Sequence, residues 1–357
     1  MNLKNLVNGL NYNKNYYIDL LKETNKKLFI YGAQKTAKRI FDILSQADID
    51  IEGFFVDDEY YKPETFLEGK KVFTKSQVLS NYSEFNTVIG FYSYLAYLEV
   101  IKEAILTKRG NVVYVPIVDW QMDLNFFNEH VNEFQKTYDW LCDEKSKNVF
   151  VAYLKSRILE TPKYLCETVT SPQYFDSFVK LSDNETFIDA GAYTGDTVSA
   201  FLEHVKNKYY KIYAFEADPN NASILNEAYK NNDKIYAIPK GLWSENTTLY
   251  FDNGNTTFSK VSTMGANKVD VVTIDSCVKD VSSDVFLKAD VEGSELEILK
   301  GAKEMIKKHR PKMAICVYHK PNDLITIPQY IKSLNNDYKF YLRHYGIAFY
   351  ETVLYAL

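Results

Sequence analysis

The segment from Thr186 to Thr197 constrains the fold of this chain more than any other. Phe187 to Ala190 is a short apolar run that predicts a buried strand, and Gly191 and Gly195 predict a tight loop after it. Apolar residues then recur with the spacing of an amphipathic helix: Val198, Phe201, Leu202 and Val205. A strand, a glycine loop and a helix in this order predict an α/β fold with a nucleotide-cofactor site, because backbone without a Cβ atom can approach a ligand closely.

An acid ends the second predicted strand of the same sheet. The strand Lys211 to Phe215 is followed by Glu216 and Ala217, and Glu216 comes 27 residues after Asp189. A carboxylate at this strand tip can accept hydrogen bonds from both hydroxyls of a ribose. A lone glutamate at a strand end is commonly an exposed acid, but the preceding glycine loop favours a ligand role. We therefore expect Glu216 to bind the sugar of a cofactor.

A third landmark is the predicted buried strand at residues 285–289. It delivers Asp290 and Glu292 to the carboxyl end of the sheet, where open α/β sheets bind their ligands. Ser294 and Glu297 follow with the S-x-x-E spacing of a capping box. Ser294 is therefore expected to cap a helix rather than to act as a nucleophile, since no G-x-S-x-G motif surrounds it.

Together these three segments resemble the FkbM family of S-adenosylmethionine-dependent methyltransferases. The resemblance extends from about Ser171 to Leu357 and includes three further stretches: Gln173–Asp176, Cys316–Lys320 and Leu342–Tyr345. It implies a class I methyltransferase-type fold, with a mostly parallel sheet and an antiparallel last strand. It also implies S-adenosylmethionine as the cofactor and O-methylation of small molecules or sugars as the reaction.

The resemblance also implies a set of cofactor-binding residues. In this fold the adenine edge packs just after the third strand, where Gly241 and Leu242 follow residues 235–238. The full predicted set is Asp189, Gly191, Ala192, Tyr193, Thr194, Gly195, Asp196, Thr197, Glu216, Ala217, Gly241, Leu242 and Asp290.

The chain length and the order of predicted elements indicate two Rossmann-like α/β domains. With 357 residues and 46% hydrophobic content, the chain can bury two cores. Predicted strands at 27–33, 51–56, 87–91 and 112–118 alternate with helical patterns, which favours a small Rossmann-like domain at residues 1–120. Residues 121–170 read as a helical connector, and residues 171–357 as the FkbM-like methyltransferase domain.

Two interpretations of the first domain stay open. It is similar to the N-terminal nucleotide-sugar-binding domain of bacterial sugar acetyltransferases, with Gly32 after the first strand and Asp57 and Asp58 after the second. Only one glycine is present in the loop, however, so a degenerate domain used for packing or homodimerisation is slightly favoured.

Composition excludes several classes of protein. A net charge of −5 argues against a nucleic-acid partner, which would call for a basic surface. No run of 18 apolar residues and no signal-like segment is present, so a cytoplasmic protein without a membrane span is expected. The four widely spaced cysteines fit neither a disulfide framework nor a structural zinc site.

Asp290 and His319 are the predicted catalytic residues. Methyl transfer to a hydroxyl requires an aligned nucleophile and a group that removes its proton. His319 has the natural pKa for a base, whereas Asp290 is better placed beside the cofactor; His344 also follows a predicted strand. Asp290, Glu292 and His319 have the donor types of a divalent-metal site. We favour the alternative that Glu292 binds the cofactor loop or caps the next helix, so a divalent metal is possible but not favoured, and no metal ligand is assigned.

We therefore expect an O-methyltransferase that acts on a hydroxyl of a sugar or glycan precursor. The acceptor sugar is expected to be a small molecule or to be linked to a nucleotide. A nicotinamide-dependent sugar oxidoreductase or epimerase would need Tyr-x-x-x-Lys on a helix, but Tyr31/Lys35 and Tyr236/Lys240 fall on predicted strands and loops. A non-catalytic interaction module is disfavoured, since the glycines and acids of the cofactor site are all present.

Overall fold

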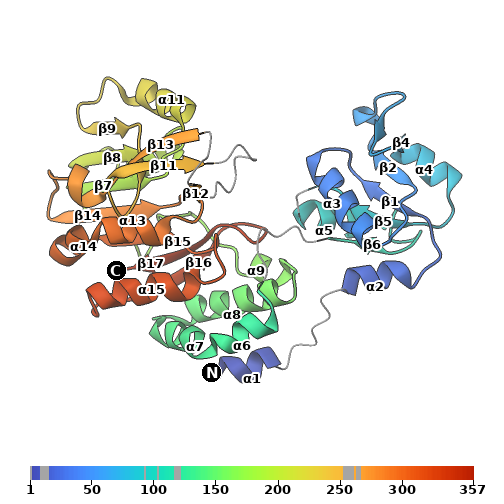
Figure 1. Ribbon diagram of the computed structural model, residues 1–357, viewed down its shortest axis with the longest axis horizontal. Coiled ribbons are helices and arrows are strands. Elements are labelled where there is room, and N and C mark those ends of the chain that lie inside the picture. The colour runs from blue at the N-terminus through green and yellow to red at the C-terminus, as the bar shows by residue number, and fades with distance from the viewer. Residues whose placement is uncertain are drawn as a thin grey trace. The chain divides into compact units, whose positions relative to one another are not determined.

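The structure is a computed structural model that describes residues 2–8, 16–91, 94–102, 104–115, 122–251, 261–262 and 267–357. The chain forms two compact units (Figure 1). The first unit comprises residues 9–121 and 155–166, and the second comprises residues 1–8, 122–154 and 167–357.

The first unit is an α/β layer structure around one sheet. Its strand order is β3-β4-β2-β1-β5-β6, and every neighbouring pair is parallel except β3–β4. The strands are β1 (Leu28–Tyr31), β2 (Gly53–Val56), β3 (Phe66–Leu67), β4 (Lys70–Thr74), β5 (Asn86–Ile89) and β6 (Val112–Val113). The helices are α2 (Tyr16–Lys22), α3 (Lys35–Gln46), α4 (Lys75–Asn81) and α5 (Tyr94–Lys102).

The predicted Rossmann-like pattern of this unit is confirmed in its central strands. Ala37, Ile40 and Leu44 of α3 are buried against the sheet, as the helical stripe predicts. The β3–β4 hairpin was not predicted; it turns at Gly69, whose φ of +73° favours glycine. The predicted strand at 112–118 is present at 112–113, and its residues 116–118 lie outside the described residues.

The second unit contains a seven-stranded sheet with the order β16-β17-β15-β14-β7-β8-β9. Six strands are parallel, and β17 runs antiparallel to both of its neighbours. This confirms the expected mostly parallel sheet with an antiparallel last strand. The strands are β7 (Glu185–Ala190), β8 (Lys211–Phe215), β9 (Ile235–Ile238), β14 (Asp284–Ala289), β15 (Lys312–Cys316), β16 (Phe340–His344) and β17 (Thr352–Ala356).

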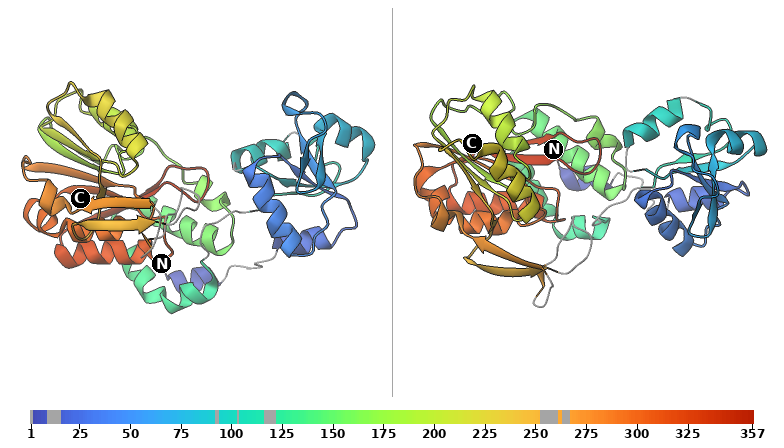
Figure 2. Two further views of the ribbon diagram at one scale, coloured as in Figure 1. Left: turned by 45° about the horizontal axis from the view of Figure 1, so that its top comes forward. Right: turned by 90° about the horizontal axis from the view of Figure 1, so that it is seen from above.

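Helices cover this sheet, and a small second sheet is inserted before β14. The second sheet has the order β10-β13-β11-β12, from β10 (Gly241–Leu242), β11 (Thr247–Phe251), β12 (Val261–Ser262) and β13 (Asn267–Val272). Helices α13 and α15 lie side by side (Figures 1 and 2). The helices of the second unit that follow β7 in the chain are α10 (Asp196–His204), α11 (Pro219–Tyr229), α12 (Ile274–Cys277), α13 (Glu295–Gly301), α14 (Lys303–His309) and α15 (Asp323–Leu334). Helix α9 (Lys163–Cys166) is part of the first unit.

The helices predicted as a connector belong mostly to the second unit. They are α6 (Leu124–Glu129), α7 (Val131–Trp140) and α8 (Glu144–Ile158), and α7 packs against both α15 and α1 (Leu3–Asn8). Phe134 and Phe150 are fully buried, and Cys142 N donates a hydrogen bond to Phe340 O. These apolar faces need a partner, so the helices extend the core of the second unit rather than forming a separate segment.

Among the residues that the structure describes, no helix has both the length and the apolar character needed to cross a membrane.

Candidate functional site

The glycine loop lies between β7 and α10, at the carboxyl edge of the seven-stranded sheet. Gly191 and Gly195 have φ values of +80° and +96°, which favour glycine. A Cβ atom on Gly191 would lie 2.1 Å from Asp290 O, so the loop and the end of β14 touch through backbone. The predicted strand, loop and helix are thus confirmed, and Gly191 is required where two strand ends meet.

Glu216 joins the glycine loop to the end of β8. Its Oε2 accepts a hydrogen bond from Tyr193 N at 2.8 Å, and its Oε1 accepts one from Asp218 N at 2.8 Å. Burial raises the pKa of Glu216, and these backbone N–H groups oppose the rise. Each carboxylate oxygen keeps a second lone pair, so the side chain can still accept the two hydroxyls of a ribose.

The predicted adenine wall lies next to this carboxylate. A Cβ atom on Gly241 would be 3.6 Å from Ala217 Cβ, and Leu242 is buried. The structure therefore brings the glycine loop, Glu216–Ala217 and Gly241–Leu242 to one region.

Not all residues of the predicted cofactor set are exposed. Asp189, Ala192, Gly195 and Thr197 are buried, whereas Tyr193 is 57% exposed. Contacts of the buried side chains with a cofactor stay a prediction.

A buried ion pair lies beneath the loop. Lys288 Nζ is 3.0 Å from Asp189 Oδ1 and donates a hydrogen bond to Gly191 O at 2.7 Å. Burial raises the pKa of Asp189 to about 6, and the charge of Lys288 limits the rise. Burial alone would lower the pKa of Lys288, but Asp189 and Asp290 outweigh it and the pKa is raised. The sequence did not predict this pair. Through Lys288 it fixes the carbonyl group of Gly191, the first residue of the glycine loop.

Two tyrosines hold the carboxylate of Asp290. The Tyr174 hydroxyl donates to Asp290 Oδ2, and the Tyr318 hydroxyl donates to Oδ1, both at 3.1 Å. Burial raises the pKa of both tyrosines, so the hydroxyls keep their protons and remain donors. The Asp290 side chain is still 24% exposed, so an acceptor can reach it.

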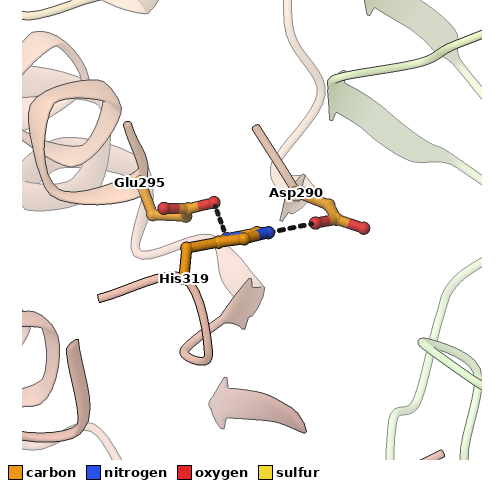
Figure 3. Close-up of side chains that lie close together, drawn as sticks. All are labelled: Asp290, Glu295 and His319. Carbon is orange, nitrogen blue, oxygen red and sulfur yellow. Dashed lines mark ion pairs between the residues drawn. The ribbon is translucent and has the colours of Figure 1, made fainter. Parts of the chain in front are cut away.

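His319 lies between two carboxylates (Figure 3). Its Nδ1 is 2.8 Å from Glu295 Oε1, and its Nε2 is 3.6 Å from Asp290 Oδ1. Burial alone would lower the pKa of His319, but Glu295, Asp290 and Glu292 outweigh it and raise the pKa to about 9. The imidazole is therefore cationic at neutral pH, and Asp290 is the remaining predicted base.

The capping box predicted from Ser294 and Glu297 is wrong. Ser294 does precede α13, but its side chain makes no capping hydrogen bond because its backbone is not extended (φ −100°, ψ 7°). Glu297 pairs instead with Lys300 at 2.6 Å. The loop before α13 is held by Glu295, whose Oε1 accepts hydrogen bonds from Val291 N and Gly293 N at 3.0 and 3.4 Å.

Residues that the sequence reasoning missed as site groups are Tyr174, Glu295 and Tyr318. Tyr174 and Tyr318 lie in stretches that carry the family resemblance, and that position was the available signal. His344, in contrast, is fully buried, and its Nδ1 forms a hydrogen bond with Thr352 Oγ1 at 2.9 Å, so it links β16 to β17.

Comparisons with known proteins agree with this geometry. Residues 189–346 match the family model described as the methyltransferase FkbM domain. The crystal structure of methyltransferase FkbM from Methylobacillus flagellatus KT is similar in fold, with a TM-score of 0.80 and 21% identity, over 99% of this chain and 97% of that chain. An rRNA methylase from Streptococcus thermophilus matches with a TM-score of 0.31 and 16% identity, over 49% of this chain and 88% of that chain, which is too weak a likeness to inform function. No curated protein matches the sequence.

Proposed function

Because residues 189–346 belong to the FkbM methyltransferase domain family, we propose that this chain is an S-adenosylmethionine-dependent O-methyltransferase. The observation that carries the proposal is the convergence of Gly191, Glu216 and Asp290 at one sheet edge. In an α/β sheet, this edge is where a nucleotide cofactor binds.

The residues present fit S-adenosylmethionine. Gly191 lets the loop lie directly against the end of β14, Glu216 offers free lone pairs to a ribose, and Gly241 and Leu242 offer a wall for an adenine. When bound, S-adenosylmethionine supplies an electrophilic methyl group on a sulfonium.

The chain's own residues would align and deprotonate the acceptor. Asp290 is ionisable, partly exposed and fixed by two tyrosine hydroxyls, so it can accept the proton of an acceptor hydroxyl. Nε2 of His319 faces the same carboxylate from 3.6 Å. Holding the hydroxyl in line with the methyl group can lower the barrier by roughly 7–11 kcal/mol at best.

We further propose a sugar or glycan precursor as the acceptor. The family resemblance supports this assignment, and so does a cavity of about 380 Å³ at the carboxyl edge of the first unit's sheet. Its lining combines aromatic faces and carboxylates, which suit hydroxyl-bearing ligands: Tyr31, Asp57, Lys75, Phe91, Ala96, Glu99 and Val100.

The test has two parts on the full chain. Isothermal titration with S-adenosylhomocysteine is expected to show micromolar binding, and isotope-labelled S-adenosylmethionine is expected to label a hydroxyl in a panel of sugars and nucleotide sugars. Absence of S-adenosylhomocysteine binding would remove the cofactor assignment. Binding together with label on nitrogen or carbon acceptors would reject O-methylation.

Replacing Glu216 by alanine is expected to weaken S-adenosylhomocysteine binding on the order of tenfold or more. The substitution removes the ribose acceptor and also frees Tyr193 N and Asp218 N, which hold the loop. Calorimetry of Glu216→Ala measures the loss, with Glu227→Ala on the exposed face of α11 as the matched control. Equal affinity of both variants would exclude Glu216 from the site.

A further inference from the structure

His319 contains a buried ring nitrogen without a hydrogen-bond partner among the described residues. The side chain is 1% exposed, and Nε2 neither donates nor accepts a hydrogen bond there. Buried polar atoms almost always form hydrogen bonds, because an unpaired one loses its hydration and no hydrogen bond compensates that free-energy cost. The position of Nε2 therefore points to a group that is bound there.

The surroundings of Nε2 are those of a cation ligand. Asp290 Oδ1 and Glu292 Oε2 each lie 3.6 Å from Nε2. This separation is too long for a hydrogen bond. Two protein atoms that share an ion at about 2.1 Å each are roughly 3.0–3.5 Å apart, so Asp290 needs only a small shift to share an ion with Nε2. Glu292 is 54% exposed, and its side chain is able to move toward the ion.

The side chains of His319 and Asp290 are themselves held by neighbouring polar groups, as the ligands of a metal ion usually are. Glu295 Oε1 lies 2.8 Å from Nδ1, on the opposite side of the ring from Asp290 (Figure 3). A carboxylate on the second ring nitrogen fixes the tautomer and orientation of a ligating histidine. Asp290 is fixed in turn by the hydroxyls of Tyr174 and Tyr318, and each of its oxygens keeps a lone pair.

We propose that Asp290, Glu292 and His319 bind one divalent cation of the Mn²⁺ or Zn²⁺ type, with Glu295 as the positioning residue. An imidazole combined with carboxylates suits these ions better than Ca²⁺, which takes oxygen ligands. A divalent metal was the less favoured alternative from sequence, and the unpaired Nε2 is the reason to favour it here. The role of the ion rests on the proposed function: the ion would displace the Nε2 proton of the imidazole to solvent, hold the hydroxyl oxygen of the acceptor and lower its pKa, and the hydroxyl proton would leave to Asp290 Oδ2, the oxygen that does not face Nε2.

The first test is electron paramagnetic resonance of the full chain titrated with Mn²⁺. One bound ion per chain is expected, with nitrogen coupling in the spin-echo signal from a directly bound imidazole. No Mn²⁺ binding, or bound Mn²⁺ without nitrogen coupling, would overturn the proposal. This measurement on the unmodified chain does not depend on any variant folding correctly.

The second test uses two variants. His319→Gln is expected to lose the nitrogen coupling, and Glu292→Gln is expected to weaken Mn²⁺ binding on the order of tenfold. The exposed Glu227→Gln serves as the control with unchanged Mn²⁺ affinity. Unchanged Mn²⁺ affinity in Glu292→Gln would remove that ligand and overturn the three-residue site. Titration with S-adenosylhomocysteine in parallel separates the two proposals, because cofactor binding without Mn²⁺ binding rejects the metal site alone.

Discussion

Replacement of Asp290 by asparagine is expected to lower kcat roughly 10²–10⁴-fold, the range that a positioned base contributes. Asparagine preserves the shape and can still accept a hydrogen bond from Tyr174 or Tyr318, but its neutral amide cannot take a proton. The affinity for S-adenosylhomocysteine is expected to change little, because Asp290 contacts β7 and the glycine loop through its backbone: its N donates to Ala190 O at 3.1 Å, and its O lies against Gly191. Steady-state kinetics and calorimetry measure the two quantities.

A matched control for this variant lies on the same strand. Asp284 begins β14 at the opposite edge of the sheet, where its Oδ2 accepts a hydrogen bond from Ser182 Oγ at 2.9 Å. Asp284→Asn is expected to keep full turnover. Equal activity of the Asp290→Asn and Asp284→Asn variants would reject Asp290 as the base.

Replacement of Asp143 by alanine is expected to destabilise the second unit by about 3 kcal/mol. Asp143 Oδ2 lies 2.7 Å from Arg343 Nη2, and the Arg343 side chain is 5% exposed. Asp143 also accepts a hydrogen bond from Ser146 N at 2.7 Å in the first turn of α8. In the variant, the buried guanidinium of Arg343 keeps one carboxylate nearby, because Asp176 Oδ2 lies 3.5 Å from its Nε. We therefore expect the loss of folding free energy to lie at the lower end of the range for a broken buried ion pair. Urea unfolding followed by tryptophan fluorescence measures the effect.

The pH dependence of the stability difference between the wild type and Asp143→Ala provides a second check. Hydrogen bonds from Arg343 and Ser146 outweigh burial and lower the pKa of Asp143 from 3.8 to about 2. A depressed pKa contributes stability that is present above the unfolded pKa and is lost as the pH falls toward the folded pKa. The wild-type advantage is therefore expected to shrink between about pH 4 and pH 2. Asp183→Ala is the control, because it breaks an exposed ion pair, that of Asp183 with Lys208. If Asp183→Ala loses as much stability as Asp143→Ala, burial of the Asp143 pair is not the cause of the effect.

The central elements of both sheets were predictable because each carries a strong local signal. The apolar run before Gly191, the acid at the end of β8 and the apolar run before Asp290 each specify a strand and the loop after it. Parallel strands place their carboxyl ends at one edge, so the sequence also indicated that Glu216 and Asp290 lie near the glycine loop. The small strands β3 and β10 carry only two residues each and give no comparable pattern.

The capping prediction failed because spacing alone does not determine a backbone angle. Ser294 and Glu297 have the right separation, but the turn through Glu292 and Gly293, both with positive φ, sets Ser294 in a conformation that cannot cap α13. Glu295 instead accepts the hydrogen bonds of the loop, from Val291 N and Gly293 N, and no local sequence pattern predicts this role.

By itself, the sequence determined the strand–loop–helix order, the antiparallel last strand through the family resemblance, and the residue types at the cofactor edge. Only the tertiary structure decided which side chains meet: Lys288 with Asp189, Tyr174 and Tyr318 with Asp290, and Glu295 with His319. Tyr174 is 116 positions from Asp290 in the chain, and contacts of that kind depend on packing between elements. Local propensity acts over a few residues, whereas burial decides the charge state and partner of each group in the site.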